Sequence, residues 1–465
     1  MTSRLTSRLS FALLGLALLL LAPGILRAED SLSWRKEQNL VDADIRNWPL
    51  PRLLQTIAVK SGWTIYVEPG AQYSATTKFK NLPAPEALRF LLGDLNFALV
   101  PETNGPTRLL VFQTSMQRAT QLIEAPVSDD SPQAVLSRIP NELIVRLKPG
   151  ANIDEIARAL GAKVVGRIEG LNAYRLEFED AAATDAARKA LDSNPEVAAV
   201  DYNYSIERPQ YAQGQTGLPI TPLNLKLNPP TGNSQIIIGL VDTPIQKLDG
   251  DLNAFLLTGI SLAGDAKPDP ANPTHATSMV WAMLTSLQSA TGGSTSVQIL
   301  PVDVYGSRSQ TSTFEVAQGI IRAVNAGANP INLSLGSPVD SPFLRDVITQ
   351  SKQQGIVFFA AAGNEPVAAP VYPAAYPDVT SVTSVDRNNH IANFANYSPT
   401  VDVGAPPATV FYFGGKPYVT AGTSVSAAYV SGMAAGIADA NKKTLSYAQT
   451  IILNNLSIKP GTLPR

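Results

Sequence analysis

The sequence feature that most constrains the fold is an uninterrupted apolar run, Ile236–Val241, which ends at Asp242. Such a run is typical of a strand buried on both faces, and strands of that kind belong to parallel sheets covered by helices. Alternation with helical patterns such as 313–326 and 344–354 predicts an α/β, doubly wound parallel sheet over residues 235–460. Further buried strands are expected at 297–304, 330–335 and 355–362.

Residue counts narrow the chemistry. The 465 residues include no cysteine and only two histidines, His275 and His390. This excludes a thiol nucleophile, disulfides, thiolate-bound metals and a multi-histidine metal centre within one chain. Lys and Arg together number 36, and Asp and Glu 38, so the chain lacks the excess of positive charge that is typical of nucleic-acid-binding proteins. No acidic loop has calcium-ligand spacing, so no cofactor is evident and a structural calcium ion stays open.

The first 28 residues have the build of a secretory signal peptide. Arg4 and Arg8 precede an apolar run over 11–22, and Ala28 offers a small residue for cleavage. The run is shorter than the roughly 20 residues that a membrane span needs, and no similar run follows. We therefore expect an exported chain with no membrane span after cleavage.

Residues 29–115 form a first block with two amphipathic helical patterns, starting near Leu50 and Leu82. Strands are expected at 63–67, 97–100 and 109–112. The segments LPRLLQTIAVKSGWTIYVEP and FKNLPAPEALRFLLGDLNFALV resemble the short N-terminal domain of secretins and TonB-linked receptors (STN-like). That resemblance implies an envelope protein partner and favours the periplasm of a double-membraned bacterium over the medium. The alternative is an intramolecular spacer or folding aid.

A second block, 137–208, follows a linker over 116–136. Its patterns predict the order β-α-β-α-β, with strands at 142–147, 173–178 and 197–202 and helices at 153–160 and 182–191. The segments NELIVRLKPGA and SNPEVAAVDYNY resemble the propeptide of subtilisin-like proteases, which implies a chaperone and inhibitor whose tail lies in the protease's own cleft. An unrelated small sandwich is the alternative. A Pro-rich linker, 209–234, is where we expect maturation cleavage.

Three residues of the third block can form one acyl-transfer site. Asp242 ends a buried strand, His275 opens a helical pattern, and Ser424 opens a helix of small residues that runs to about 440. Taken singly, His275 reads as an ordinary surface or core histidine and Ser424 as an N-cap. Their order, Asp then His then Ser, is the order of the subtilisin triad. Ser424 would then attack, His275 move the proton and Asp242 orient the imidazole.

Asn364 follows Gly363 at the end of an expected strand. Its amide can donate a hydrogen bond to a tetrahedral oxyanion, or it can belong to a plain Gly-Asn turn. His390 lies in a polar turn, 386–390, and we interpret it as a solvated surface residue.

Seven ordered motifs in the third block resemble subtilisin-like serine proteases (peptidase family S8). They are Val241-Asp242-Thr243, Thr274-His275, Asn332 to Gly336, Ala361 to Asn364, Tyr372 to Val379, Val401 to Pro406 and Gly422-Thr423-Ser424. The resemblance implies a serine endopeptidase acting on protein or peptide substrates. It also implies a substrate-pairing strand and pocket walls, formed by Ser334, Leu335, Gly336, Ala362 and Gly363, and the small walls favour a large apolar side chain.

The motifs also depart from the family's pattern. Pro244 stands where glycine is usual, Asn272-Pro273 precedes Thr274, and Val425-Ser426 follows the nucleophile. These departures keep open a catalytically weak or inactive adaptor that presents the first block in the envelope. A triad that performs ligation or esterolysis is a further alternative.

Overall fold

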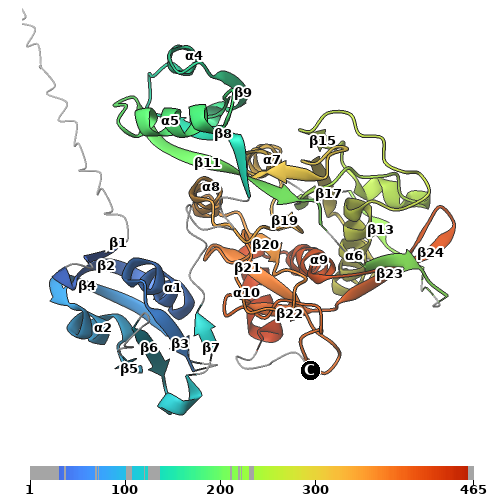
Figure 1. Cartoon of the computed structure of the whole chain (residues 1–465). Helices are drawn as coiled ribbons and strands as arrows, with labels where there is room; N and C mark the ends of the chain where they lie inside the picture. The colour runs from blue at the N-terminus through green and yellow to red at the C-terminus, as the bar shows by residue number, and fades with distance from the viewer. Residues whose placement is uncertain are drawn as a thin grey trace, which may run out of the picture.

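The computed structural model describes residues 31–35, 38–68, 71, 73–100, 107–119, 121–123, 137–209, 212–217, 220, 222–229 and 235–458. Figure 1 shows three parts along the chain: an N-terminal module in blue, a smaller part in green above, and a large part from yellow to red. The signal peptide expected at 1–28 lies outside the described residues.

The N-terminal module packs two helices against two sheets. Its core is formed entirely by its own residues, from Leu32 to Ile123. The sheets have the orders β1-β2-β4 and β5-β6-β3-β7. The elements are β1 (Ser31–Arg35), β2 (Leu40–Pro49), α1 (Leu50–Ser61), β3 (Thr64–Val67), β4 (Ser74–Pro83), α2 (Ala84–Leu92), β5 (Asn96–Val100), β6 (Arg108–Phe112), the 3-10 turn η2 (Met116–Arg118) and β7 (Gln121–Ile123).

Both expected helices and the antiparallel pairing of β5 with β6 are present in this module. The apolar spacing explains α1, because Leu53, Leu54 and Ile57 lie on its buried face. The sequence patterns did not predict β1, β2 and β4. β7 pairs with β3, so the sheet extends into the segment expected to be a linker.

The second part has the order β-α-β-β-α-β, one strand more than the pattern predicted. The additional strand, β9, alternates exposed and half-buried residues, so it lacks the apolar signal of its neighbours. Its elements are β8 (Arg138–Leu147), α4 (Ile153–Ala159), β9 (Lys163–Ile168), η3 (Glu169–Leu171), β10 (Ala173–Glu177), α5 (Ala181–Asp192) and β11 (Val197–Glu207).

The third part is built on a seven-stranded parallel sheet with the order β15-β17-β14-β19-β20-β21-β22, which confirms the expected doubly wound α/β fold. The sheet strands are β14 (Ile237–Asp242), β15 (Ile260–Ser261), β17 (Gln298–Asp303), β19 (Ile331–Leu333), β20 (Phe358–Ala361), β21 (Val379–Ser384) and β22 (Val403–Ala405). The remaining elements are β12 (Ala212–Gln215), β13 (Lys226–Leu227), η4 (Gly250–Phe255), α6 (His275–Thr291), β16 (Ser294–Thr295), β18 (Gln310–Ser312), α7 (Thr313–Asn325), α8 (Pro342–Gln353), β23 (Ala408–Phe413), β24 (Lys416–Ala421), α9 (Thr423–Asn441) and α10 (Leu445–Leu456).

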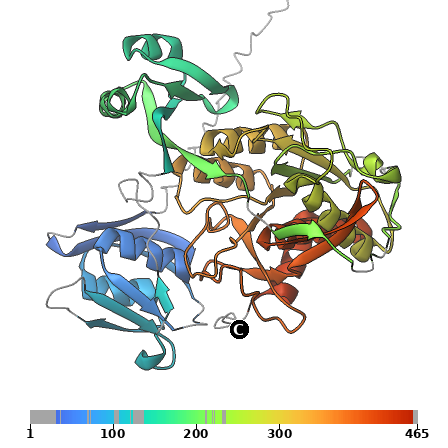
Figure 2. The same ribbon diagram turned by 45° about the vertical axis from the view of Figure 1, so that its right-hand side comes forward.

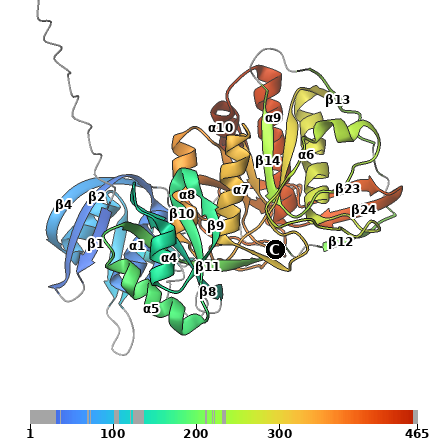
Figure 3. The ribbon, with the colours of Figure 1, turned by 90° about the horizontal axis from the view of Figure 1, so that it is seen from above.

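Helices cover both faces of this sheet. Val241 faces a core shared with α7 and α8, whereas Leu240 faces the core of α6. The core of α9 and α10 lies under β20 to β22. Figure 3, seen from above, has β14 between α7 and α6. This alternation along β14 explains its continuous apolar run, since each face needs apolar residues.

The second part is joined to the third by a continuous sheet. The end of β11 pairs with β18, with Ile206 opposite Thr311. Asn203 Oδ1 accepts hydrogen bonds from Thr313 Oγ1 at 3.0 Å and Phe314 N at 3.1 Å, so it satisfies one backbone N–H at the start of α7. Ile144, Ile168 and Ile206 lie in the same core cluster as residues of α7 and α8.

The segment 209–234, expected to be a linker, contains two strands. β12 pairs with β24, and β13 pairs with β16, so this stretch lies along the third part. The N-terminal module lies on another side of that part in Figure 2. A cavity of about 730 Å³ between them is lined by residues of both, among them Arg52 and Tyr376. Within the described ranges, no helix is long and apolar enough to cross a membrane.

Candidate active site

Asp242 ends β14 at the carboxyl edge of the parallel sheet, where ligands gather in open α/β folds. Its side chain is fully buried, and Oδ1 accepts a hydrogen bond from Thr243 N at 2.6 Å. Thr243 Oγ1 in turn accepts from Ala276 N at 3.0 Å. The strand end is thereby fastened to the first turn of α6, which carries the histidine.

His275 is the first residue of α6. Thr274 is the N-cap, and its Oγ1 accepts a hydrogen bond from Thr277 N at 3.2 Å, which fixes the start of the helix. The imidazole is buried, and Nδ1 lies 2.8 Å from each carboxylate oxygen of Asp242. An Nδ1–H donor in this contact leaves Nε2 as the acceptor nitrogen of the neutral ring.

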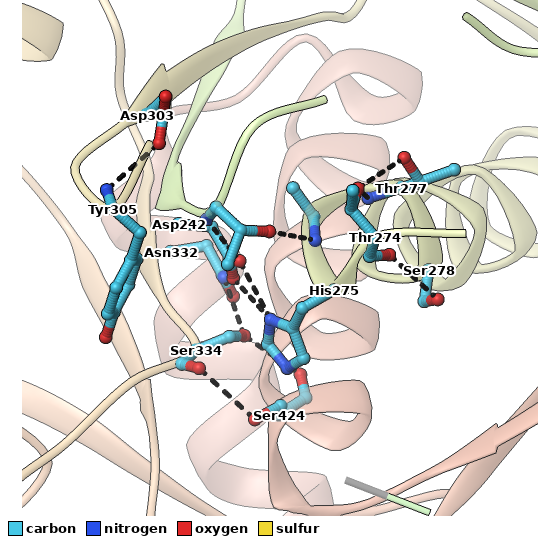
Figure 4. Close-up of polar contacts among 12 residues, drawn as sticks. Asp242, Thr274, His275, Thr277, Ser278, Asp303, Tyr305, Asn332, Ser334 and Ser424 are labelled. Carbon is cyan, nitrogen blue, oxygen red and sulfur yellow. Dashed lines mark hydrogen bonds and ion pairs between the residues drawn. The ribbon is translucent and has the colours of Figure 1, made fainter. Parts of the chain in front are cut away.

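Ser424 lies in the first turn of α9, and its side chain is buried. Its Oγ donates to the Ser334 carbonyl at 3.2 Å, and Ser334 Oγ donates to the Ser424 carbonyl at 3.0 Å. Figure 4 shows the imidazole of His275 between Asp242 and Ser424. Residues from a strand end and two helix starts therefore meet at one point.

A buried polar chain lies behind this serine. Asn332 Nδ2 donates to Ser334 Oγ at 2.8 Å, and its Oδ1 accepts from Ser431 Oγ at 3.0 Å. Ser431 lies further along α9, so Asn332 connects β19 to the serine helix. These contacts hold the helix start against the sheet, because buried polar groups without partners would cost free energy.

Asn364 lies beside the head of α9. Its Oδ1 accepts from Thr423 N at 2.8 Å and from Thr423 Oγ1 at 3.0 Å. Thr423 Oγ1 accepts from Gly363 N at 3.1 Å. The carbonyl end of the amide is thus held by the residue before Ser424.

The residues predicted to wall the substrate pocket lie next to the same helix start. Ser334 contacts Ser424 directly, and Leu335 and Ala362 are buried. Gly363 has φ +112°, and a Cβ atom there would come within 2.7 Å of Asn396 Oδ1. Only glycine fits this position without strain. Gly336 continues the chain after Leu335.

Further buried groups border the site. Tyr305 follows β17, and burial together with the nearby Asp242 carboxylate raises the pKa of its hydroxyl well above the usual value. Burial also raises the pKa of Asp303, whose Oδ1 accepts from Tyr305 N and Gly306 N at 2.9 and 2.8 Å. In the part of the chain that the structure describes, no group of three or more His, Asp or Glu side chains gathers as a metal site.

His390 lies apart from these residues, in the exposed turn where we expected it. Its imidazole is 34 % exposed, and Nδ1 lies 3.3 Å from Asp386.

Sequence reasoning assigned no role to several residues of the site, although Thr243 and Asn332 lie in motifs quoted above. Thr243, Asn332 and Ser431 are polar residues inside apolar elements, and that contrast was an available signal. Tyr305 had no such signal. Its position depends on a turn that only the tertiary structure creates.

Comparisons with known proteins identify this architecture. Residues 233–459 match the model of the subtilase family, and residues 128–203 match that of the fervidolysin N-terminal prodomain. Thermitase of Thermoactinomyces vulgaris is 30 % identical over 230 residues, which cover 82 % of that protein and 48 % of this chain. The chain belongs to the subtilase family. It is a subtilisin-like serine endopeptidase preceded by a prodomain.

With two other known proteins, the similarity extends beyond the catalytic part of this subtilase. A thermophilic serine proteinase of Bacillus sp. (strain AK1) is 27 % identical over 366 residues, 74 % of this chain and 91 % of that protein. Fervidolysin from Fervidobacterium pennivorans aligns with a TM-score of 0.52 at 18 % identity, covering 70 % of this chain and 60 % of that one. At that identity the likeness shows the fold alone. The second part of the subtilase is hereafter called the prodomain and the third the catalytic domain.

Proposed function

We propose that this subtilase hydrolyses peptide bonds with Ser424 as nucleophile, His275 as general base and acid, and Asp242 as the group that orients the imidazole. The observation that carries the proposal is the pair of 2.8 Å contacts from His275 Nδ1 to Asp242, in a buried site beside Ser424. A carboxylate on Nδ1 keeps the acceptor nitrogen, Nε2, toward the serine.

In the first step, Ser424 Oγ turns from the Ser334 carbonyl to His275 Nε2, loses its proton to that nitrogen and attacks the substrate carbonyl carbon. The imidazolium that forms is stabilised by Asp242, and it then protonates the departing amine. Water repeats the sequence on the acyl-enzyme and releases the acid.

The negative charge on the oxygen of the tetrahedral intermediate has to be stabilised by hydrogen-bond donors. Asn364 lies beside the serine, with its Oδ1 held by Thr423, and we propose that its Nδ2 donates to the oxyanion. The positive end of the α9 dipole, at the start of the helix, adds a favourable field.

For the residue before the cleaved bond, we propose a pocket walled by Ser334, Leu335, Gly336, Ala362 and Gly363 that accepts a large apolar side chain. The support is the small size of four of these residues and their position beside Ser424. A strict preference for acidic or basic residues at that position would contradict this proposal.

We propose further that the enzyme is made as a self-inhibited zymogen. Directly after the prodomain strand β11, the backbone N–H of Arg208 donates to the Ser309 carbonyl at 2.7 Å. After the prodomain, β12 pairs with β24, placing Ala212 opposite Ala421, close before Ser424 in sequence. The segments before and after the proposed cut therefore both pair with strands of the catalytic domain, as a bound peptide would.

Gln213 supports the second of these pairings with its side chain. Nε2 donates to the Pro273 carbonyl at 3.1 Å, and Oε1 accepts from Ser278 Oγ at 3.1 Å and Thr420 Oγ1 at 3.3 Å. Because Pro273 and Ser278 flank His275, this side chain ties the segment to the histidine loop. We propose that the maturation cut falls between Pro209 and Ala212.

We propose that residues 1–28 direct export, and that the N-terminal module is STN-like and docks to an envelope protein partner, in the periplasm of a double-membraned bacterium. The support is the signal-peptide pattern and the self-contained core of the module, which is distinct from the core shared by prodomain and catalytic domain.

A direct test expresses the full chain as wild type and as Ser424→Ala, with His390→Ala as a matched control. We expect wild type and His390→Ala to cut themselves, and N-terminal sequencing to find a new end between Gln210 and Ala212. Ser424→Ala should stay whole. If wild type stays whole and hydrolyses no casein, the protease proposal fails and the adaptor alternative takes its place.

A further inference from the structure

Arg208, shortly before the proposed cut, places a guanidinium in a defined contact with the catalytic domain. Arg208 Nε donates to the Arg308 carbonyl at 3.0 Å, and Nη2 donates to the Gly306 carbonyl at 2.7 Å. Its Cζ lies 5.5 Å from the centroid of the Tyr305 ring. Two carbonyls and an aromatic ring therefore surround one planar cation.

The turn that presents these carbonyls is held in place from within. Asp303 Oδ1 accepts from Tyr305 N and Gly306 N. Gly306 has φ +57°, and a Cβ atom there would come within 2.7 Å of the Ala263 carbonyl oxygen, so the turn requires glycine.

Arg308 holds the turn from the other side. Its Nη2 donates to the Val304 carbonyl at 3.0 Å, and its Nη1 contacts Glu315 Oε1 at 2.8 Å. The positive charge of Arg308 is thus engaged by a buried carboxylate, which reduces its repulsion of Arg208. The receptor carbonyls are fixed before a ligand arrives, and such preorganisation favours binding.

This contact lies next to the catalytic residues. Asp303 is opposite Asp242 in the paired strands β17 and β14, and Val304 N donates to the Asp242 carbonyl at 3.0 Å. The Tyr305 hydroxyl donates to the Glu207 carbonyl at 3.0 Å, which holds the backbone of the incoming segment.

Side chains of that segment alternate as in any extended strand. Ile206 is buried and Glu207 is exposed, so Arg208 is the next residue directed toward the catalytic domain. The alternation of the extended segment therefore directs the Arg208 guanidinium toward the catalytic domain, and the contact is not that of a side chain lying loosely on the surface.

We propose that this turn is a substrate subsite that selects arginine upstream of the cleaved bond, and that Arg208 occupies it in the uncleaved chain. The inference rests on the proposed function, because it assumes that the surface that binds residues 205–208 also binds substrates. The planar fork of arginine matches two carbonyl acceptors and stacks on a ring, whereas the ammonium of lysine matches neither arrangement as well. A cut between Pro209 and Ala212 puts the arginine two to four residues before the cleaved bond.

The experiment uses full-length chain that has processed itself and has been titrated with a fluorophosphonate probe. Peptide libraries with each residue scanned through the four positions before the cut are then compared at equal active-site concentration. We expect arginine to raise kcat/KM by about tenfold over leucine at one of the second to fourth positions, with lysine in between.

Two variants of Tyr305 make the test specific. Tyr305→Leu removes the ring and should reduce the arginine preference several-fold, whereas Tyr305→Phe keeps the ring and should retain the preference. Hydrolysis of peptides without arginine, measured in parallel, corrects for any general loss of activity. A titratable enzyme without an arginine preference, or one whose preference survives in Tyr305→Leu, overturns the inference alone. A chain that neither processes itself nor reacts with the probe overturns the proposed function and this inference together.

Discussion

The chain holds two histidine–aspartate pairs with the same atoms in contact and very different surroundings. His275 Nδ1 lies 2.8 Å from Asp242, with side chains 1 % and 0 % exposed. His390 Nδ1 lies 3.3 Å from Asp386, with side chains 34 % and 49 % exposed. The difference shows that two properties decide the chemistry of such a pair: its burial, and the group that lies on the far side of the imidazole.

The exposed pair stabilises a turn. Asp386 Oδ1 accepts hydrogen bonds from His390 N at 2.9 Å and from Asn388 N at 2.7 Å. Both bonds lower the pKa of the Asp386 carboxyl, and the bond from His390 N has the larger effect. Water screens the charge of both partners. The buried pair joins residues that are 33 positions apart, and it faces a serine at a helix start.

The largest expected effect separates the two histidines. His275→Ala should reduce kcat/KM by at least about 10⁴-fold, because no other group can take the proton of Ser424. His390→Ala should leave kcat/KM within about twofold, since it removes a solvent-screened contact. Hydrolysis of a chromogenic peptide by titrated enzyme measures both. Equal losses in the two variants would contradict the assignment of the base.

Replacing each aspartate with asparagine tests the same difference between the buried and the exposed pair. Asp242→Asn should lower kcat by about 10³–10⁴-fold with the fold intact, because an amide permits the wrong imidazole tautomer. Asp386→Asn should leave kcat unchanged. The pH profile is a second readout, since Asp242→Asn should regain activity at high pH where hydroxide assists. Full activity of Asp242→Asn at neutral pH would sink the orienting role.

The oxyanion donor has no counterpart at the exposed turn. Asn364→Ala should lower kcat by about 10²–10³-fold and change KM little, because the lost bond forms mainly in the transition state. Asn388→Ala, in the turn with His390, is the matched control and should have no effect. A change confined to KM would assign Asn364 to substrate binding instead.

The smallest effect concerns a third carboxylate, Asp402, which lines the cavity between the N-terminal module and the catalytic domain. Partial loss of hydration raises the pKa of Asp402 to about 6, although a hydrogen bond from Ser381 N to its Oδ2, at 2.8 Å, favours the charged form. The unfolded chain loses this proton near pH 4 and the folded chain near pH 6, so stability falls as pH rises through that window.

Asp402→Asn keeps the acceptor oxygen and removes the charge. In the Ser424→Ala background it should raise the melting temperature slightly at pH 8, because solvent screens part of the carboxylate charge, and change it little at pH 4. Asp386→Asn serves as the control and should not raise the melting temperature at pH 8, because its hydrogen bonds lower the pKa of that carboxyl. A variant less stable than its parent at pH 8 would mean that the Asp402 carboxylate is stably ionised in the folded chain.

The sequence predicted the elements whose signal is local. The apolar run before Asp242, the helices that begin at His275 and Ser424, and the polar turn at His390 all follow from spacing and composition. Asp242, His275 and Ser424 each lie at the end of one of these elements. Once the order of the strands is known, the positions of the elements therefore bring the three residues together.

What the sequence did not predict depends on contacts between distant segments. β9 has little apolar signal of its own, and β7 and β12 are strands only because β3 and β24 offer them free edges. The carbonyls that hold Arg208 come from a turn whose shape is set by Asp303 and Gly306. No single-residue preference encodes such an arrangement.

The most direct measurement of the central claim is intact and peptide mass spectrometry after reaction with a fluorophosphonate. Wild type and His390→Ala should each gain one adduct, located on the peptide that contains Ser424, and His275→Ala should react far more slowly. Ser424→Ala should gain none. An adduct on another residue, or labelling of the Ser424→Ala chain at the wild-type rate, would contradict the account.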